Sequence, residues 1–94
     1  MIVRQGNRYL IEGPVTLDNV GTLLAEGAAF EGDGVIVDLA RVTGADSSAL
    51  SLLLEWVRRS SSSGGQISFA NLSPNLISMA DLYGIAELIP AATD

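Results

Sequence analysis

The feature that most constrains the fold of this chain is a short apolar strand pattern that leads almost directly into a helix. Residues 35–39 form an apolar run with β-branched side chains, which is typical of a central strand covered on both faces. After a short loop, a helical pattern begins at Asp46-Ser47-Ser48 and covers about residues 47–60. Its core stripe, at i, i+3, i+4 and i+7, consists of Leu50, Leu53, Leu54 and Val57. A helix that starts just after a buried strand predicts an α/β fold.

The remaining patterns add strands and helices in alternation. In chain order they predict a hairpin over residues 1–13, a helix over about 18–30, a turn at 32–34, a strand over 66–70, a helix from Pro74 to Gly84 and a last short strand over 87–89. Thr16 or Asp18 is the predicted N-cap of the first helix, and Ser73 that of the last. The alternation predicts a mixed sheet with parallel neighbours and right-handed crossovers. A chain of 94 residues has the length of one domain, covering residues 1–94.

The composition excludes several kinds of chemistry. The chain contains no cysteine, histidine or lysine, so it has no disulfide framework, no Ser-His-Asp triad, no Walker A lysine and no Schiff-base lysine. No ordinary base is therefore available to activate a serine nucleophile. We expect a non-catalytic protein without a cofactor or a bound metal.

The charge and hydropathy of the chain bear on its partners. A net charge of −6 disfavours nucleic acid and anionic lipid surfaces, and it favours a protein partner with a basic or mixed patch. Alternatively, the acidic charge only keeps a small domain soluble. No apolar run approaches the ~20 residues that a membrane helix needs, and no secretory signal is visible. We therefore expect a cytoplasmic protein that does not insert into a membrane.

The start of the second helix is the candidate site. A hydroxyl residue here caps free backbone N–H groups, and the same place best tolerates an added phosphate. Ser47, beside the carboxylate of Asp46, is therefore a candidate phosphorylation or partner-binding switch. The alternative for Ser47 is capping alone, and Asp46 is either the N-cap or a hydrogen-bond acceptor for the loop. Ser48 is expected in the first helical turn.

Further candidates come from the helix faces. Ala49, Leu52 and Trp56 lie off the main core stripe, where they form either a partner-binding face or the edge of the core under the first helix. Tyr83 is either a packed aromatic at a helix end or a partner contact.

Arginine side chains give a second set of alternatives. Arg41 either is solvated or pairs with a carboxylate, which is Asp38, Asp46 or one from a partner. Arg58 and Arg59 are expected as helix-end charges, with a possible contact to an acidic patch of a partner.

Two stretches of the chain resemble the STAS domain, the fold of anti-sigma factor antagonists and related modules. They are Asp46-Ser47-Ser48-Ala49-Leu50 and residues 76–85, which read LISMADLYGI, and their order and spacing extend the resemblance over nearly the whole chain. The resemblance implies a mixed four- to five-stranded sheet with an N-terminal hairpin and about three to four helices packed on it.

Two branches of this family are similar to the chain. Anti-sigma factor antagonists carry a phosphorylatable serine directly after the aspartate, here Ser47, and bind a kinase-type anti-sigma factor. The second branch is the small cytoplasmic STAS subunit of the Mla-type (toluene-tolerance-type) phospholipid ABC transporter, in which the residue matching Ser47 lies at the contact with the ATPase. Ala49 replaces the glycine usual in antagonists, and the sequence from Leu52 to Trp56 reads LLLEW. Both features favour the transporter branch.

Overall fold

Strands and helices alternate along the chain after an N-terminal hairpin. The computed structural model describes residues 1–30 and 34–92. Its strands are β1 (Ile2–Gln5), β2 (Arg8–Ile11), β3 (Gly13–Val15), β4 (Val35–Asp38), β5 (Val42–Ala45) and β6 (Ile67–Ala70). Its helices are α1 (Val20–Glu26), α2 (Ser48–Ser62) and α3 (Pro74–Leu82), with short 3-10 turns η1 (Gly27–Ala29) and η2 (Ala86–Leu88). The predicted turn at 32–34 falls largely outside the described residues.

The main sheet is mixed, as the alternation predicts. Its strand order is β1-β2-β4-β6, with β1 antiparallel to β2 and the other neighbours parallel. The predicted hairpin is confirmed, and Gly6 adopts a left-handed φ of 65° in its turn. A second, two-stranded sheet joins β3 to β5 in parallel. The sequence did not predict β5, because the pairing that makes it a strand comes from a segment about 30 residues away.

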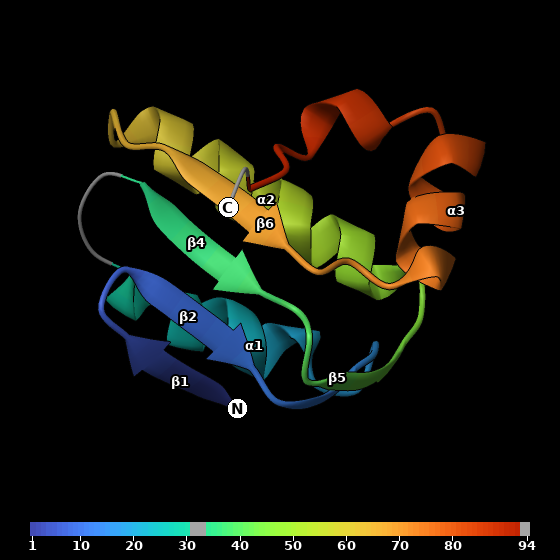
Figure 1. Ribbon diagram of the computed structural model, residues 1–94, viewed down its shortest axis with the longest axis horizontal. Helices are drawn as coiled ribbons and strands as arrows, with labels where there is room; N and C mark the ends of the chain where they lie inside the picture. The colour runs from blue at the N-terminus through green and yellow to red at the C-terminus, as the bar shows by residue number, and fades with distance from the viewer. Residues whose placement is uncertain (31–33, 93–94) are drawn as a thin grey trace.

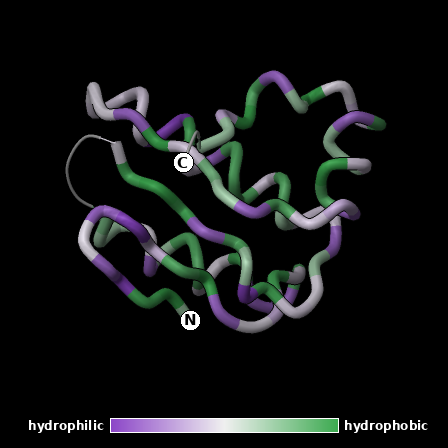
Figure 2. The backbone as a smooth tube through the Cα atoms, viewed as in Figure 1, coloured by the Kyte–Doolittle hydropathy of each residue, from purple (hydrophilic) through white to green (hydrophobic). Residues whose placement is uncertain are grey.

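Helices α1 and α2 lie behind the main sheet, while α3 lies beyond the end where β4 and β6 finish (Figure 1). Strand β4 is hydrophobic over most of its length (Figure 2), and its Val35 and Val37 are buried. Side chains alternate between the faces of a strand, so Ile36 and Asp38 lie on the opposite face. The prediction that this strand is covered on both faces holds only in part, because Ile36 is half-buried although Asp38 on the same face is buried, and no described helix lies in front of β4 (Figure 1).

Helix α1 is shorter than the predicted helix over 18–30. Neither Thr16 nor Asp18 is its N-cap, because the helix begins after Asn19. The Asn19 side chain turns back to the preceding loop, where Oδ1 accepts from the Thr16 N–H at 2.9 Å and Nδ2 donates to the Pro14 carbonyl at 2.7 Å. The helix then tightens into η1 at Gly27.

The ends of α3 follow the predicted signals. Ser73 is the N-cap, its Oγ accepts from the Leu76 N–H at 3.2 Å, and Pro74 opens the helix. Gly84 follows the helix with a left-handed φ of 71°. Both termini of α3 are therefore determined by local sequence.

After α3, the predicted strand over 87–89 is replaced by η2. The chain pairs with β6 slightly later instead: the Phe69 N–H donates to the Pro90 carbonyl at 2.9 Å, and the Ala92 N–H donates to the Phe69 carbonyl at 2.8 Å. This tail covers the β6 edge of the main sheet.

Candidate functional site

Asp46 connects the start of α2 to the loop that precedes α1. One carboxylate oxygen, Oδ1, accepts from the Ser48 N–H at 2.9 Å and from the Ser48 hydroxyl, so Asp46 caps the helix. The other, Oδ2, accepts from the Leu17 N–H at 3.1 Å. The hydrogen bonds from Ser48 and Leu17 hold the pKa of Asp46 below its usual value. The two alternatives for Asp46, capping and loop bonding, are therefore both realised.

Ser47 is exposed at the first turn of α2. Its backbone is already helical, with φ −63° and ψ −19°, and its hydroxyl makes no capping hydrogen bond. Because Asp46 does the capping, the Ser47 hydroxyl faces solvent. Ser48 lies in the first turn, as predicted, and its hydroxyl is bonded to Asp46. Of the two serines, Ser47 is the one that a partner or a kinase can reach.

The apolar second face predicted for α2 is not a surface. Ala49, Leu52 and Trp56 are only 2–3% exposed, and all three belong to the core cluster. Helix α2 packs against both α1 and α3, so side chains beyond the main stripe are also covered. The reading of Trp56 as core under the first helix is confirmed, since a Cβ on Gly27 would lie 2.2 Å from its Nε1. Side-chain contacts from these three residues to a partner are ruled out in this conformation.

The exposed face of α2 is polar instead. It begins at Ser47 and continues through Ser51, Glu55, Arg58 and Ser62, of which only Glu55 is half-buried. At 100° per residue these positions fall within one stripe of about 80°. We call these five residues the α2 stripe.

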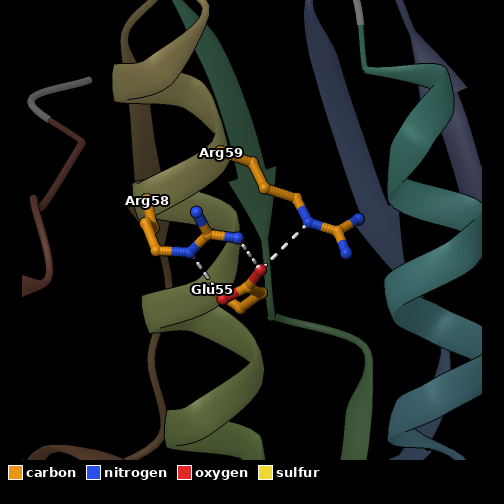
Figure 3. A network of polar contacts seen from close by, with 3 residues as sticks. All are labelled: Glu55, Arg58 and Arg59. Carbon is orange, nitrogen blue, oxygen red and sulfur yellow. Dashed lines mark hydrogen bonds and ion pairs between the residues drawn. The ribbon is translucent and has the colours of Figure 1, made fainter.

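Glu55, Arg58 and Arg59 form a compact network on and beside the α2 stripe (Figure 3). Arg58 binds Glu55 through two nitrogens, at 2.9 and 2.5 Å, and Arg59 reaches the same carboxylate through Nε at 3.1 Å. The hydrogen bond from Arg58 lowers the pKa of Glu55 to about 2. We call these three residues the arginine patch.

Arg41 takes neither of the intramolecular partners predicted for it. It pairs with Glu12 at 2.6 Å, because the Gly13 N–H bonds to the Arg41 carbonyl and brings the two segments together.

Asp38 binds Arg8 instead. One carboxylate oxygen accepts from Arg8 Nε at 2.9 Å, and the other accepts from Asn71 Nδ2 and the Ala40 N–H, each at 2.9 Å. Burial of the Asp38 carboxylate opposes ionisation, but these hydrogen bonds outweigh it and lower its pKa.

Tyr83 is 56% exposed at the C-terminal end of α3. The opposite end of that helix, at Ser73, shares a hollow with Ala45 beside the start of α2. Tyr83 is therefore accessible, as a partner contact requires, but the structure does not bring it together with Ser47. Exposed apolar residues that the sequence reasoning missed are Leu17, Ile77, Leu82 and Leu88.

The described residues contain neither a membrane-length helix nor a metal-binding cluster. In residues 1–30 and 34–92, no helix is long and apolar enough to cross a bilayer. Within the same ranges, no group of three or more acidic, histidine or cysteine side chains is placed to hold a metal ion.

One family model matches most of the chain. The family model described as "Mlab, STAS domain" matches residues 7–90. The chain belongs to this STAS family. A comparison of the STAS domain with curated proteins finds no match.

Solved structures show the same fold. The unphosphorylated anti-sigma factor antagonist SpoIIAA superposes with a TM-score of 0.73 at 18% identity, over 100% of this STAS domain and 88% of that chain. A sulfate transporter family protein from Wolinella succinogenes gives a TM-score of 0.69 at 20% identity, over 90% of this chain and 73% of that one. The predicted α/β STAS fold is confirmed.

Proposed function

We propose that this STAS domain is a non-catalytic cytoplasmic subunit that binds and supports the ATPase of a phospholipid ABC transporter. The observation that carries the proposal is the match to the MlaB-type family model over residues 7–90. The exposed hydroxyl of Ser47, on a helix start capped by Asp46, supports it. Binding would stabilise one conformation of the ATPase and so shift its population.

The contact surface proposed for the ATPase is Ser47, with Asp46 and Ser48 as the residues that hold it in place. The α2 stripe replaces the buried face of Ala49, Leu52 and Trp56 as the continuation of this surface. Leu17 joins it, because its backbone is bonded to Asp46 and its side chain is 77% exposed. Apolar anchors of this kind commonly provide binding energy at the centre of an interface.

The second candidate is an anti-sigma factor antagonist, favoured by one observation. Ser47 is exposed and free of hydrogen bonds from its side chain among the described residues, which leaves its hydroxyl accessible to a kinase. A phosphate there would stand beside the Asp46 carboxylate, so the added charge would change the surface strongly. In this alternative the partner is a kinase-type anti-sigma factor that is released on phosphorylation.

Capture from native cytoplasm and solubilised membranes, followed by mass spectrometry, tests the proposal. We expect wild type to recover an ABC ATPase with its permease, and Ser47→Asp to lose them, because the substitution places a second carboxylate beside Asp46. Ser47→Ala is the matched control without charge. If Ser47→Ala still binds and Ser47→Asp does not, the interface rejects a negative charge at this position but does not need the hydroxyl. Loss of binding with both variants shows that the hydroxyl itself is a contact.

One outcome contradicts the transporter proposal, and another contradicts only the place of Ser47 in it. Recovery of a kinase-like anti-sigma factor together with phosphate on Ser47 would assign the domain to the antagonist branch. Recovery of the same ATPase by wild type and Ser47→Asp alike would remove Ser47 from the interface while leaving the ATPase as the partner.

A further inference from the structure

The arginine patch is a local excess of positive charge on an acidic protein. The chain carries a net charge of −6, yet here two guanidinium groups share the single carboxylate of Glu55. Elsewhere in the described structure, Arg8 and Arg41 each form an ion pair with a separate carboxylate, Asp38 and Glu12. The patch therefore carries two positive charges for one carboxylate, a local surplus of one.

The patch also has hydrogen-bond donors left over. Arg58 binds Glu55 through Nε and Nη2, and Arg59 through Nε alone. In the described part of the chain, Nη1 of Arg58 and both terminal nitrogens of Arg59 have no protein acceptor. Figure 3 shows the end of the Arg59 side chain pointing away from Glu55. A planar guanidinium with free nitrogens suits a second carboxylate, which it can bind through two parallel hydrogen bonds.

Stability does not account for this arrangement. The side chains of Arg58 and Arg59 are 65% and 48% exposed, and exposed ion pairs of this kind contribute little to folding. What Glu55 does is hold two long, flexible side chains in fixed positions at the surface. Such ordering before binding reduces the entropy that association costs.

The position of the patch connects it to the proposed binding surface. Arg58 lies on the α2 stripe with Ser47, eleven residues further along the helix. At 1.5 Å per residue the two positions are about 16 Å apart along the axis, which lies within one ordinary protein interface. A partner that covers Ser47 and runs along the stripe will reach Arg58.

We propose that the arginine patch receives a carboxylate from an acidic segment of the partner protein. This inference rests on the proposed function, in which the partner is the transporter ATPase. The patch fixes the direction in which that segment lies, from Ser47 toward the C-terminal end of α2. An anionic membrane is a poorer occupant, because lipid-binding patches cluster about 4–8 basic residues and a protein of this net charge is repelled by such a surface.

A charge reversal tests the proposal with the captured ATPase as the probe. We expect Arg58→Glu to weaken binding at least about tenfold, with a smaller effect at about 300 mM than at about 50 mM salt. Arg41→Glu is the matched control, because Arg41 is 54% exposed and ion-paired but lies outside the stripe. It should bind within about twofold of wild type. Equal binding of wild type and Arg58→Glu would overturn the proposal while leaving the ATPase as partner.

A second measurement separates this inference from the proposed function if no ATPase is captured. Arginine Nε–Hε signals of the labelled domain are followed by NMR during titration with a synthetic helical peptide that carries two glutamates, beside its glutamine counterpart. Shifts at Arg58 and Arg59 with the glutamate peptide only, and none at Arg41, support carboxylate recognition. No shift would overturn it, and so would sedimentation with phosphatidylglycerol vesicles that is lost in Arg58→Glu.

Discussion

At the scale of single residues, Gly27, in the turn η1 that follows α1, lies against Trp56 of α2. A Cβ added there would lie 2.2 Å from Trp56 Nε1 and 2.7 Å from Cε2, closer than real Cβ atoms come. The indole cannot move aside easily, because Trp56 is 2% exposed and its ring meets that of Phe30 at a centroid distance of 5.0 Å. We expect Gly27→Ala to lower the free energy of unfolding by about 1–3 kcal/mol through overpacking. Urea denaturation measures the change.

Gly21 provides a matched control in the adjoining helix α1. Nothing lies within 4 Å of a Cβ built on Gly21, which is exposed. Gly21→Ala is therefore expected to raise the free energy of unfolding by about 0.5–1 kcal/mol, since alanine has the higher helix propensity. Equal effects of the two substitutions would show that the contact with Trp56 is looser than the structure indicates.

At the scale of elements, Asp46 holds the loop before α1 against the start of α2. We expect Asp46→Ala to leave the fold intact but to speed amide hydrogen exchange at Leu17 and Ser48, because their N–H groups lose their acceptor. Ser48→Ala is the control, since it removes only the hydroxyl contact and leaves the bond to Leu17. Unchanged exchange at Leu17 in Asp46→Ala would mean that the loop is held by other contacts.

The predictability of each element depended on how local its determinants are. The start of α2 and both ends of α3 were predicted, because a carboxylate or hydroxyl cap, a proline and a glycine act within a few residues of the boundary. Strand β5 and the tail pairing at Phe69 were missed, because each depends on backbone partners distant in sequence. No local signal distinguishes such segments from loops.

In the candidate site too, residues identified by a local motif were predicted, and residues positioned by long-range contacts were not. Ser47 and Asp46 were located from the motif at the helix start. The burial of Ala49 and Leu52 could not be read from a helical wheel, because it depends on α1 and α3 packing on both sides of α2. Leu17 was missed because its link to the start of α2 is a long-range hydrogen bond from its N–H to Asp46.

At the scale of the whole molecule, stability should depend on pH only under acid conditions. Asp38, Asp46 and Glu55 all have folded pKa values below their ordinary values, with Glu55 at about 2. The unfolded chain, with carboxyl pKa values of about 4, binds more protons than the folded chain below about pH 5. Their contribution is thus fully present above about pH 5 and is lost as the pH falls toward about 2. The chain has no histidine, so we expect a flat profile between about pH 6 and pH 8.

Urea denaturation at a series of pH values from about 8 to about 3 tests this expectation, and Asp38→Asn tests the contribution of the most buried of the three carboxylates. Asp38 is 6% exposed, so its ion pair with Arg8 is the least screened of the three interactions. The substitution should lower the free energy of unfolding at pH 7 by about 2–4 kcal/mol, since it removes a buried carboxylate that accepts from Arg8, Asn71 and the Ala40 N–H. It should also reduce the acid slope, because the titrating group is gone. A slope below pH 5 as steep as in wild type would show that Asp38 is not the group that couples protonation to unfolding.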